Sequence, residues 1–328
     1  MTATHKPVWV IVEQTGDVIA AVSFQLIGKA RKLADQMSVP VEAILLGNDT
    51  AGLPRQLIAA GADRVYLCDA PELRQYQSEL FTQIIAELAV KNQPDIMLLG
   101  STPMGRELAP LVAGRLKTGL TAHCIDLVLD ENRILQQKIP AYGGMLTIIC
   151  PQKRPQMATV AKGVFSSLEP DVNRCGKIIP VTLPVEIPTR LKTLEVVQKV
   201  PRGVPLESAS IVVAGGAGAG GPEGWGQIVE LAATLGAAVG STRPAVDEGW
   251  TALETMIGQS GRMCEPEFYI GVGLSGELQH MVGIAGSGLM AAVNNDPRSP
   301  IFEQVDFGVV DDCREFVPAL IKKLRASR

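Results

Sequence analysis

Short apolar runs alternate with segments of helical periodicity along the first half of the chain, and this alternation constrains the fold more than any other feature. Val8–Val12 is an unbroken apolar run, typical of a strand buried on both faces, and Val22–Met37 follows it with its apolar residues on one helical side. Three more strand–helix pairs follow: Val41–Leu46 and Pro54–Ala60, Val65–Leu67 and Ser78–Val90, and Ile96–Leu99 and Glu107–Arg115. Such alternation predicts right-handed crossovers and a parallel sheet.

The pattern changes between His123 and Gly176, where strand-like segments follow one another without helices. These segments are Cys124–Leu129, Arg133–Ile139, Met145–Cys150 and Gln156–Val160. They predict an antiparallel extension of the first domain. Ile178–Val200 is then expected to be an extended strand that leads into a linker, and the Pro- and Gly-containing stretch Pro201–Ser208 predicts a domain boundary.

The α/β pattern starts again after this boundary. The predicted strands are Ser210–Ala214, Ala237–Gly240, Phe268–Val272 and Leu289–Val293, and the predicted helices are Gln227–Leu235 and Phe316–Leu324. We therefore predict an α/β fold with two domains. Residues 1–200 form a parallel-sheet domain with an antiparallel extension, and residues 201–328 form a Rossmann-like, doubly wound domain.

Composition narrows the function classes. The 328 residues are 46% hydrophobic and only 4% aromatic, with 33 glycines, which is typical of α/β proteins, and the net charge of −4 does not favour a nucleic-acid surface. The six cysteines are scattered without a C-x-x-C motif, which favours reduced thiols over a metal or iron–sulfur site. The sequence shows no signal peptide and no apolar stretch of membrane-spanning length. We expect a soluble, cytoplasmic protein without membrane insertion or a nucleic-acid partner.

Five glycine-rich or polar clusters follow apolar runs in the second half. They are Gly215–Gly221, Ser241–Asp247, Gly258–Gly261, Gly273–His280 and Asn294–Pro297. Loops at strand ends carry the ligand chemistry of α/β folds. These clusters contain an arginine, a histidine, hydroxyls and amides, but no evident acid/base pair or nucleophile–His–acid arrangement. They favour a site that holds a large, flat, polar cofactor over one that converts a substrate.

The glycine-rich turn is compatible with two interpretations. Gly216–Gly221 matches G-x-G-x-x-G between a strand and a helix, where a pyrophosphate can approach bare backbone, but a tight turn alone would also explain it. A nicotinamide-dependent oxidoreductase would need an acidic residue after the next strand, for the ribose. That strand instead ends in Ser241-Thr242-Arg243, which argues against the usual nicotinamide site, although an arginine there can serve a 2′-phosphate.

Single residues in these loops also leave alternatives open. Arg243 can neutralise an anionic ring or phosphate, or be solvated; Asn294 can bind ribose or phosphate, or begin a turn. Ser275 is predicted to cap the following helix, with Gln279 one turn later. His280 lies beside them, and a titratable imidazole near a redox ring can stabilise its reduced, negatively charged form.

Taken together and in order, the segments resemble the large (alpha) subunit of the electron transfer flavoprotein family, over essentially the whole chain. The motifs are V-W-V-I-V-E-Q (Val8–Gln14), L-I-G-K-A-R-K-L-A (Leu26–Ala34), G-R-E-L-A-P (Gly105–Pro110), T-G-L-T-A-H-C (Thr118–Cys124), P-A-Y-G-G (Pro140–Gly144), R-P-Q-M-A-T-V (Arg154–Val160), A-A-V-G-S-T-R-P-A-V-D-E-G-W (Ala237–Trp250), G-Q-S-G (Gly258–Gly261), Y-I-G-V-G-L-S-G-E-L-Q-H (Tyr269–His280) and P-I-F-E-Q-V-D-F-G-V-V-D-D (Pro300–Asp312).

The resemblance implies a heterodimer in which the C-terminal domain of the alpha subunit binds FAD and the N-terminal domain packs on the beta subunit. Such a protein carries electrons from dehydrogenases, such as acyl-CoA dehydrogenases, to another redox acceptor, and membership of an electron-bifurcating complex is compatible with it. Two other interpretations compete: the nicotinamide-dependent oxidoreductase above, and a regulatory module that binds a nucleotide in the N-terminal domain. The complete set of C-terminal loops argues against the regulatory module.

The resemblance also implies roles for individual residues. Arg243 would lie against the isoalloxazine, Ser260 would reach its N5 region with Gln259 beside it, and Asn294 and Asp312 would hold the adenosine half. Ser275, Gln279 and His280 would line the pyrophosphate, ribityl and ring-carbonyl side. The full set of expected FAD-binding residues is Ala217, Gly218, Ser241, Thr242, Arg243, Gly258, Gln259, Ser260, Gly261, Ser275, Gly276, Gln279, His280, Asn294 and Asp312.

Three positions depart from the family pattern. Ala217 stands where the glycine-rich turn commonly has arginine, Met145 stands where asparagine is usual, and Ile139 stands where arginine is common. Loss of a cation near the flavin disfavours its anionic forms, so Ala217 predicts a lower reduction potential, or less accumulated anionic semiquinone, than in an arginine-bearing relative.

Overall fold

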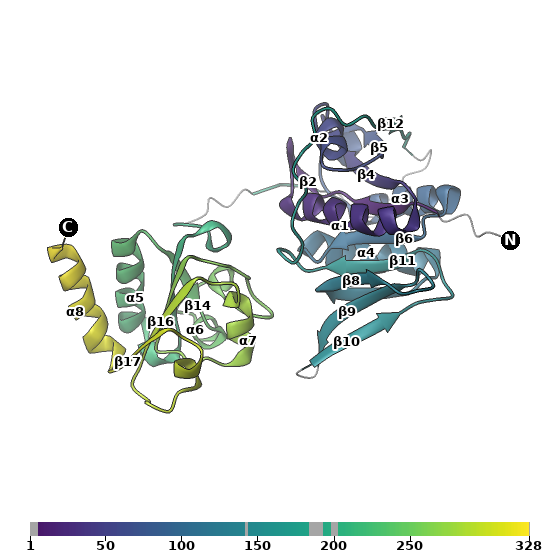
Figure 1. Cartoon of the computed structure of the whole chain (residues 1–328). Helices are drawn as coiled ribbons and strands as arrows, with labels where there is room; N and C mark the ends of the chain where they lie inside the picture. Colours follow the sequence, from purple (N-terminus) through teal and green to yellow (C-terminus); the bar gives the residue numbers. More distant parts are fainter. Residues whose placement is uncertain (1–5, 142–143, 184–192, 198–202, 328) are drawn as a thin grey trace. The chain divides into compact units, whose positions relative to one another are not determined.

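The protein divides into two compact units, Met1–Val196 and Val197–Arg328, which we call the N-terminal and C-terminal units. The structure is a computed structural model, and it describes residues 6–141, 144–183, 193–197 and 203–327 (Figure 1). Each unit is an α/β fold built on a parallel sheet, so the predicted fold class is confirmed. Parts of the predicted linker and boundary, residues 184–192 and 198–202, lie outside the described residues.

The N-terminal unit contains a seven-stranded parallel sheet in the order β12-β5-β4-β1-β6-β11-β7. Its strands are β1 (Val8–Ile11), β4 (Val41–Gly47), β5 (Arg64–Asp69), β6 (Ile96–Gly100), β7 (Leu120–Cys124), β11 (Gln156–Val160) and β12 (Lys177–Pro180). Successive residues of a strand point to opposite faces, so Val8 and Val10 enter one core while Trp9 and Ile11 enter the other. The first core packs against α1 (Ala21–Met37) and α2 (Leu53–Ala59), and the second against α3 (Ser78–Asn92) and α4 (Pro103–Leu116). Gln14–Thr15 (β2) and Val18–Ile19 (β3) form a small separate hairpin.

The predicted antiparallel extension exists, and three of its four predicted strands belong to it, but the fourth does not. It consists of β8 (Asp126–Leu129), β9 (Leu135–Ala141) and β10 (Gly144–Ile149), which pair antiparallel in the order β10-β9-β8. Gln156–Val160, expected in the extension, is instead β11, which pairs in parallel with β6 and β7. All five of its residues are buried, which is the environment of an interior strand in a sheet covered on both faces. The predicted strand Cys124–Leu129 is divided at Ile125 between the two sheets.

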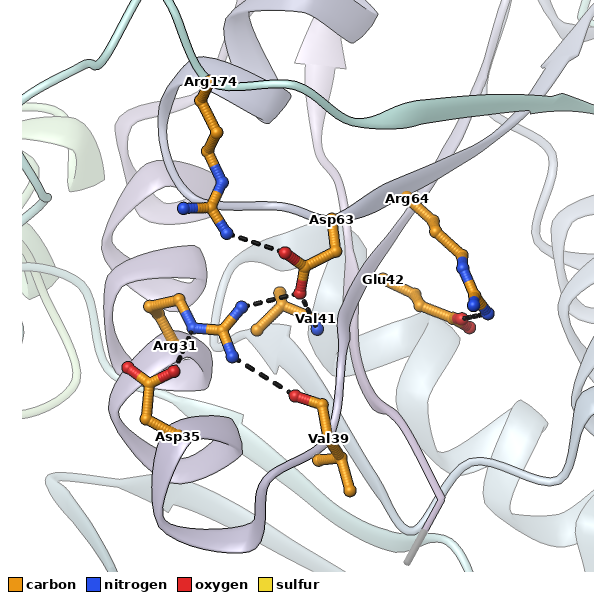
Figure 2. Close-up of polar contacts among 8 residues, drawn as sticks. All are labelled: Arg31, Asp35, Val39, Val41, Glu42, Asp63, Arg64 and Arg174. Carbon is orange, nitrogen blue, oxygen red and sulfur yellow. Dashed lines mark hydrogen bonds and ion pairs between the residues drawn. The ribbon is translucent and has the colours of Figure 1, made fainter.

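Asp63 connects three separate segments of the N-terminal unit (Figure 2). Its Oδ2 accepts hydrogen bonds from Arg31 Nη1 at 2.6 Å and from the Val41 N–H at 2.8 Å, and its Oδ1 accepts one from Arg174 Nη2 at 2.7 Å. Burial alone would raise the pKa of Asp63, but the Val41 N–H and the two guanidinium groups hold it below its usual value. This carboxylate therefore fastens α1, β4 and the chain leading into β12 to one another.

The C-terminal unit contains a five-stranded parallel sheet in the order β14-β13-β15-β16-β17. Its elements are β13 (Ile211–Gly215), α5 (Pro222–Leu235), β14 (Ala238–Ser241), α6 (Arg243–Asp247), β15 (Phe268–Val272), α7 (Leu278–Met281), β16 (Leu289–Asn294), β17 (Phe307–Val310) and α8 (Cys313–Ala326). Helices α5 and α8 pack side by side on one face (Figure 1). Because β13 lies between β14 and β15, the direction of winding reverses there, and ligands bind at the carboxyl ends of strands at such switch points.

Helices α4 and α5 begin earlier than predicted, and an edge strand was missed. Helix α4 begins at Pro103 because the Thr102 hydroxyl caps it, accepting from the Gly105 N–H at 2.9 Å. Helix α5 begins at Pro222 rather than Gln227, and the edge strand β17 was not predicted. None of the helices within the described residues combines the length and hydropathy that a membrane span requires.

Candidate functional site

A cleft of about 470 Å³ opens at the carboxyl ends of the strands of the C-terminal sheet. The loops that follow all five strands contribute to it, as the switch-point geometry of this fold predicts. Its lining consists of Ala217, Gly218, Thr242, Arg243, Pro244, Met256, Ile257, Gly258, Ser260, Gly273, Leu274, Ser275, Gly276, Glu277, Gln279, His280, Asn294, Asn295, Asp312, Cys313 and Arg314.

Three of the expected FAD-binding residues do not line this cleft: Ser241, Gln259 and Gly261. Ser241 is fully buried, and its hydroxyl lies 2.9 Å from the Thr255 hydroxyl. The backbone N–H of Gln259 donates to the Gln279 carbonyl at 2.7 Å. A Cβ on Gly261 would lie 2.3 Å from the Met256 carbonyl oxygen. These residues hold the loops that carry the lining residues.

Glycines allow two of the loops to approach closely at the switch point. The Gly218 N–H donates to the Gly273 carbonyl at 2.8 Å, and a Cβ on Gly218 would lie 2.7 Å from the Gly273 Cα. A side chain at either position would therefore push apart the turn after β13 and the loop after β15. The cleft floor at this point is bare backbone, which suits the close approach of a phosphate group.

Two arginines supply the positive charge of the cleft. Arg243 begins α6, and its side chain is 74% exposed and contacts Asp247, at i,i+4, at 3.2 Å. Arg314 lies in the first turn of α8, which follows β17, the edge strand opposite β14 in the sheet. Its side chain is 61% exposed. Both guanidinium groups therefore remain accessible to an anionic ligand.

His280 lines the cleft, but its ring nitrogens are engaged inside the protein. Nδ1 lies 3.2 Å from the Ile257 carbonyl, which only accepts, so Nδ1 carries the proton. The hydroxyl of the fully buried Tyr269 then donates to Nε2 at 2.7 Å. Burial lowers the pKa of His280 to about 4, although the hydrogen bond to Ile257 opposes this. At neutral pH the imidazole is uncharged, so it does not supply the positive charge that sequence considerations suggested for a reduced ring.

This geometry makes a prediction for the pH dependence of stability. The imidazole of an unfolded chain titrates near 6.5, whereas that of folded His280 titrates near 4. The unfolded state therefore binds the proton more readily, and the stability of the C-terminal unit should fall as the pH drops from about 6.5 to about 4 and then level off. Nitrogen-15 NMR of labelled histidine should show a neutral Nδ1–H imidazole at pH 6, and Tyr269→Phe should raise its pKa. A His280 signal that titrates normally in the wild type would contradict this assignment.

The predicted capping role of Ser275 is changed by the structure. Ser275 is not a helix cap: α7 covers only Leu278–Met281, its N-cap is Glu277, and no side chain caps it. The loop from Gly273 turns instead through Gly276, whose φ of +80° brings it against Ile301, so the helix starts later than a serine cap would require. The prediction for Ser275 as a lining residue is unaffected by this change.

The side chains of Asn294 and Asp312 already have protein partners. Asn294 Nδ2 donates to the Leu274 carbonyl at 2.9 Å, which joins the loops after β15 and β16. Asp312 caps α8 by accepting from the Arg314 N–H at 2.9 Å, and it also binds the Arg314 guanidinium. That guanidinium lowers the pKa of Asp312 to about 2. Both residues position neighbouring groups of the cleft as well as lining it.

Sequence reasoning missed several lining residues. They are Pro244, Met256, Ile257, Gly273, Leu274, Glu277, Asn295, Cys313 and Arg314. Cys313 and Arg314 follow a strand that was not predicted because three of its four residues are exposed, at the sheet edge. The acidic pair Asp311-Asp312 before the helix was the available signal for a helix start at the cleft.

The lining groups fit an extended, anionic nucleotide cofactor. The volume lies in the range of about 300–1,000 Å³ that is usual for small-molecule sites, and bare backbone, hydroxyls, amides and two guanidinium groups surround it. Fold and cleft together define the class: a doubly wound α/β protein that holds a nucleotide-type cofactor at its switch point.

Comparison with known proteins identifies the family. Residues 8–186 match the electron transfer flavoprotein domain, and residues 205–285 match the electron transfer flavoprotein FAD-binding domain. The alpha subunit of electron transfer flavoprotein from Thermoanaerobacterium thermosaccharolyticum is 43% identical, over 98% of both chains. The alpha subunit from Megasphaera elsdenii is 38% identical over 99% of this chain and 98% of its own, and the FixB protein of Rhizobium meliloti is 40% identical over 96% and 92%.

The chain belongs to the electron transfer flavoprotein family, as an alpha subunit. Its C-terminal unit contains the FAD-binding domain, its function is electron transfer through FAD, and the family implies a beta subunit as its partner. The predictions of family, cofactor and general function are thereby confirmed. Asn294, Asn295 and the start of α8 line the cleft but lie beyond the residues that the FAD-binding model matches.

Proposed function

We propose that the cleft at the switch point of the C-terminal unit is the FAD site, and that the chain carries electrons without converting a substrate of its own. The observation that carries this proposal is the convergence of loops from all five strands on one cleft with two accessible arginines. When bound, FAD supplies one- and two-electron redox chemistry. The contribution of the chain is to bind the cofactor, orient it and set the charge around it.

Arg243 and Ser260 line the part of the cleft where we place the isoalloxazine ring. The guanidinium of Arg243 favours the negative charge that the ring gains on reduction, and the Ser260 hydroxyl is a hydrogen-bond partner for the N5 region. Ser275, Gln279 and His280 line the middle of the cleft, where we place the ribityl chain, pyrophosphate and ring carbonyls. A neutral Nδ1–H imidazole orients its neighbours without adding charge.

Three titratable lining side chains support a carrier over a nicotinamide-dependent oxidoreductase. His280 is bonded to Tyr269, Asp312 to Arg314, and the Cys313 thiol donates to the Gly218 carbonyl at 3.2 Å. Burial raises the pKa of Cys313, which keeps it protonated. Among the described lining residues, these three groups are therefore poorly placed to exchange protons with a substrate.

The protein partners of the chain are also part of the proposal. We place the N-terminal unit on the beta subunit, and we propose a dehydrogenase such as an acyl-CoA dehydrogenase as the electron donor. All six cysteines are free, which is compatible with a reducing compartment such as the cytoplasm.

Anaerobic reduction of the purified heterodimer tests this proposal. The complex should contain one flavin per alpha subunit in the proposed cleft, and its visible absorbance should bleach when a catalytic amount of acyl-CoA dehydrogenase is added together with an excess of its acyl-CoA substrate as the electron source. A flavin-containing complex that no acyl-CoA dehydrogenase reduces would reject the proposed donor. A colourless complex that oxidises a nicotinamide would reject the carrier function itself.

A further inference from the structure

The start of α8 is fastened to the glycine-rich turn that follows β13. The Cys313 thiol, which is only 7% exposed, donates to the Gly218 carbonyl at 3.2 Å. The next residue, Arg314, lies over the end of this turn: a Cβ on Gly220 would be 3.8 Å from both Cδ and Nη1 of Arg314. The guanidinium of Arg314 is thus held at a turn that lies far earlier in the sequence, since the thiol contact joins residues 95 positions apart.

Asp312 fixes the orientation of this guanidinium. Its carboxylate accepts from Arg314 Nε at 3.1 Å and from Nη2 at 2.6 Å, a two-point contact that holds the guanidinium plane. Within the described part of the chain, Nη1 makes no hydrogen bond, and it is the nitrogen nearest Gly220. One edge of the guanidinium therefore faces the turn with its donors available.

The turn itself provides no positive side chain. Ala217 and Gly218 are the residues of the turn that line the cleft, and both are exposed there. Bare backbone lets a phosphate approach closely but leaves its charge to be balanced by another segment. Arg314 lies within 4 Å of the Cβ position of Gly220 in this turn, although β17 is three strands away from β13 in the sheet.

We propose that Arg314 is the cation that binds the phosphate groups of FAD in this chain, a role that the glycine-rich turn with Ala217 does not fill. Asp312 is then a positioning residue, which orients the guanidinium. The two arginines divide the cofactor between them: Arg314 binds the phosphates and Arg243 faces the redox ring. This inference rests on the proposed placement of FAD in the cleft.

The test is an FAD titration of the flavin-depleted heterodimer, followed by quenching of flavin fluorescence. Arg314→Gln should raise the dissociation constant for FAD at least about tenfold, because a charge-assisted contact to phosphate is lost. The reduction potential of the reconstituted variant should stay close to that of the wild type, since the phosphates are remote from the redox ring. Arg325→Gln is the matched control: it removes the same charge at the other end of α8, where Arg325 pairs with Glu230, and should bind FAD as the wild type does.

A second substitution supplies the cation from the turn. Ala217→Arg combined with Arg314→Gln should recover most of the lost affinity, because residue 217 also lines the cleft and its neighbour Gly218 contacts Cys313. Arg314→Gln leaves the cap of α8 in place, since Asp312 accepts from the backbone N–H of residue 314, so thermal unfolding of the apoprotein should be unchanged. Arg314→Lys should lose less affinity than Arg314→Gln.

Three results would overturn the inference. FAD affinity that falls no further in Arg314→Gln than in Arg325→Gln would show that Arg314 does not bind the cofactor. A potential that shifts as far as in an Arg243 variant would place Arg314 at the ring. Equal losses in Arg314→Lys and Arg314→Gln would exclude charge as the cause. If any of these results is obtained while the wild-type heterodimer binds FAD tightly, this inference alone is rejected. If the wild-type heterodimer binds no FAD, the proposed function is rejected.

Discussion

Gly258→Ala is expected to destabilise the C-terminal unit by about 2–5 kcal/mol and to weaken FAD binding at least tenfold. Gly258 has a φ of +137°, in a region that side-chain-bearing residues rarely adopt, and a Cβ there would lie 2.3 Å from the Gln279 carbonyl oxygen. The same Cβ would come within 3.2 Å of the His280 Cα. The clash is with backbone, so relief requires movement of the turn or of α7, both of which form the cleft wall. Thermal and urea unfolding of the heterodimer, with its flavin content, measure both effects.

Gly226→Ala is the matched control for this substitution. Gly226 lies inside α5, and a Cβ there would have no atom within 4 Å. The same glycine-to-alanine change should therefore stabilise the unit by about 0.5–1 kcal/mol, because alanine favours the helix. Opposite signs for the two variants are the expected result. If Gly258→Ala left both stability and flavin content unchanged, the close packing of the Gly258–Gly261 turn on α7 would be disproved.

Arg243→Gln is expected to lower the two-electron reduction potential of the bound FAD by about 20–60 mV, corresponding to about 1–3 kcal/mol. The sign follows because removal of a cation beside the ring disfavours the negative charge gained on reduction. Solvent screening keeps the shift in potential small, since the Arg243 side chain is 74% exposed in the chain alone. A redox titration of the heterodimer against a dye of known potential measures the shift.

Two variants separate the charge of Arg243 from its other properties. Arg243→Lys keeps the charge, so its reduction potential should stay close to that of the wild type. Arg298→Gln removes the same charge from a side chain that is 93% exposed and does not line the cleft, so its effect should be within the error of the titration. Equal shifts in Arg243→Gln and Arg298→Gln would mean that only net charge matters, and Arg243 would then not lie at the ring.

The residue at position 217 is also expected to affect the reduction potential of the bound FAD. The sequence predicts a lower potential than in a relative with arginine at this position, and Ala217→Arg should raise it if the new guanidinium reaches the ring. The position of Arg314 beside the turn changes the expectation for where this guanidinium acts. If residue 217 faces the phosphates, Ala217→Arg should improve FAD affinity more than it changes the potential.

The strands and the strand-end loops could be predicted from the sequence because each leaves a local signal. Val8–Val12 is an unbroken apolar run because its strand is buried on both faces, and Arg243 follows a strand directly. The partners of a strand leave no such local signal: Gln156–Val160 was recognised as a strand but assigned to the wrong sheet, because its pairing with β6 depends on the folded chain. Local periodicity indicates what an element is, and only tertiary contacts decide where it pairs.

The same distinction applies to the cleft. His280 was found from its place in a strand-end loop, but its neutral state follows from burial, and its partner Tyr269 reaches it from β15 inside the core. The acidic pair Asp311-Asp312 was a local signal for a helix start, but it did not place Arg314 at the glycine-rich turn. The strand β17 is short and largely exposed, and the contact with Gly220 joins distant parts of the sequence. Residues directly after buried strands could be predicted, whereas those that reach the site from an edge strand or through a buried hydrogen bond could not.

An experimental structure of the heterodimer with FAD tests the central claim most directly, because it locates the cofactor against the residues of this chain. We expect the isoalloxazine ring against Arg243 and Ser260, and the phosphates between Gly218 and Arg314. FAD bound outside the switch-point cleft of the C-terminal unit, or with its ring at Arg314 and its adenine at Arg243, would contradict the account.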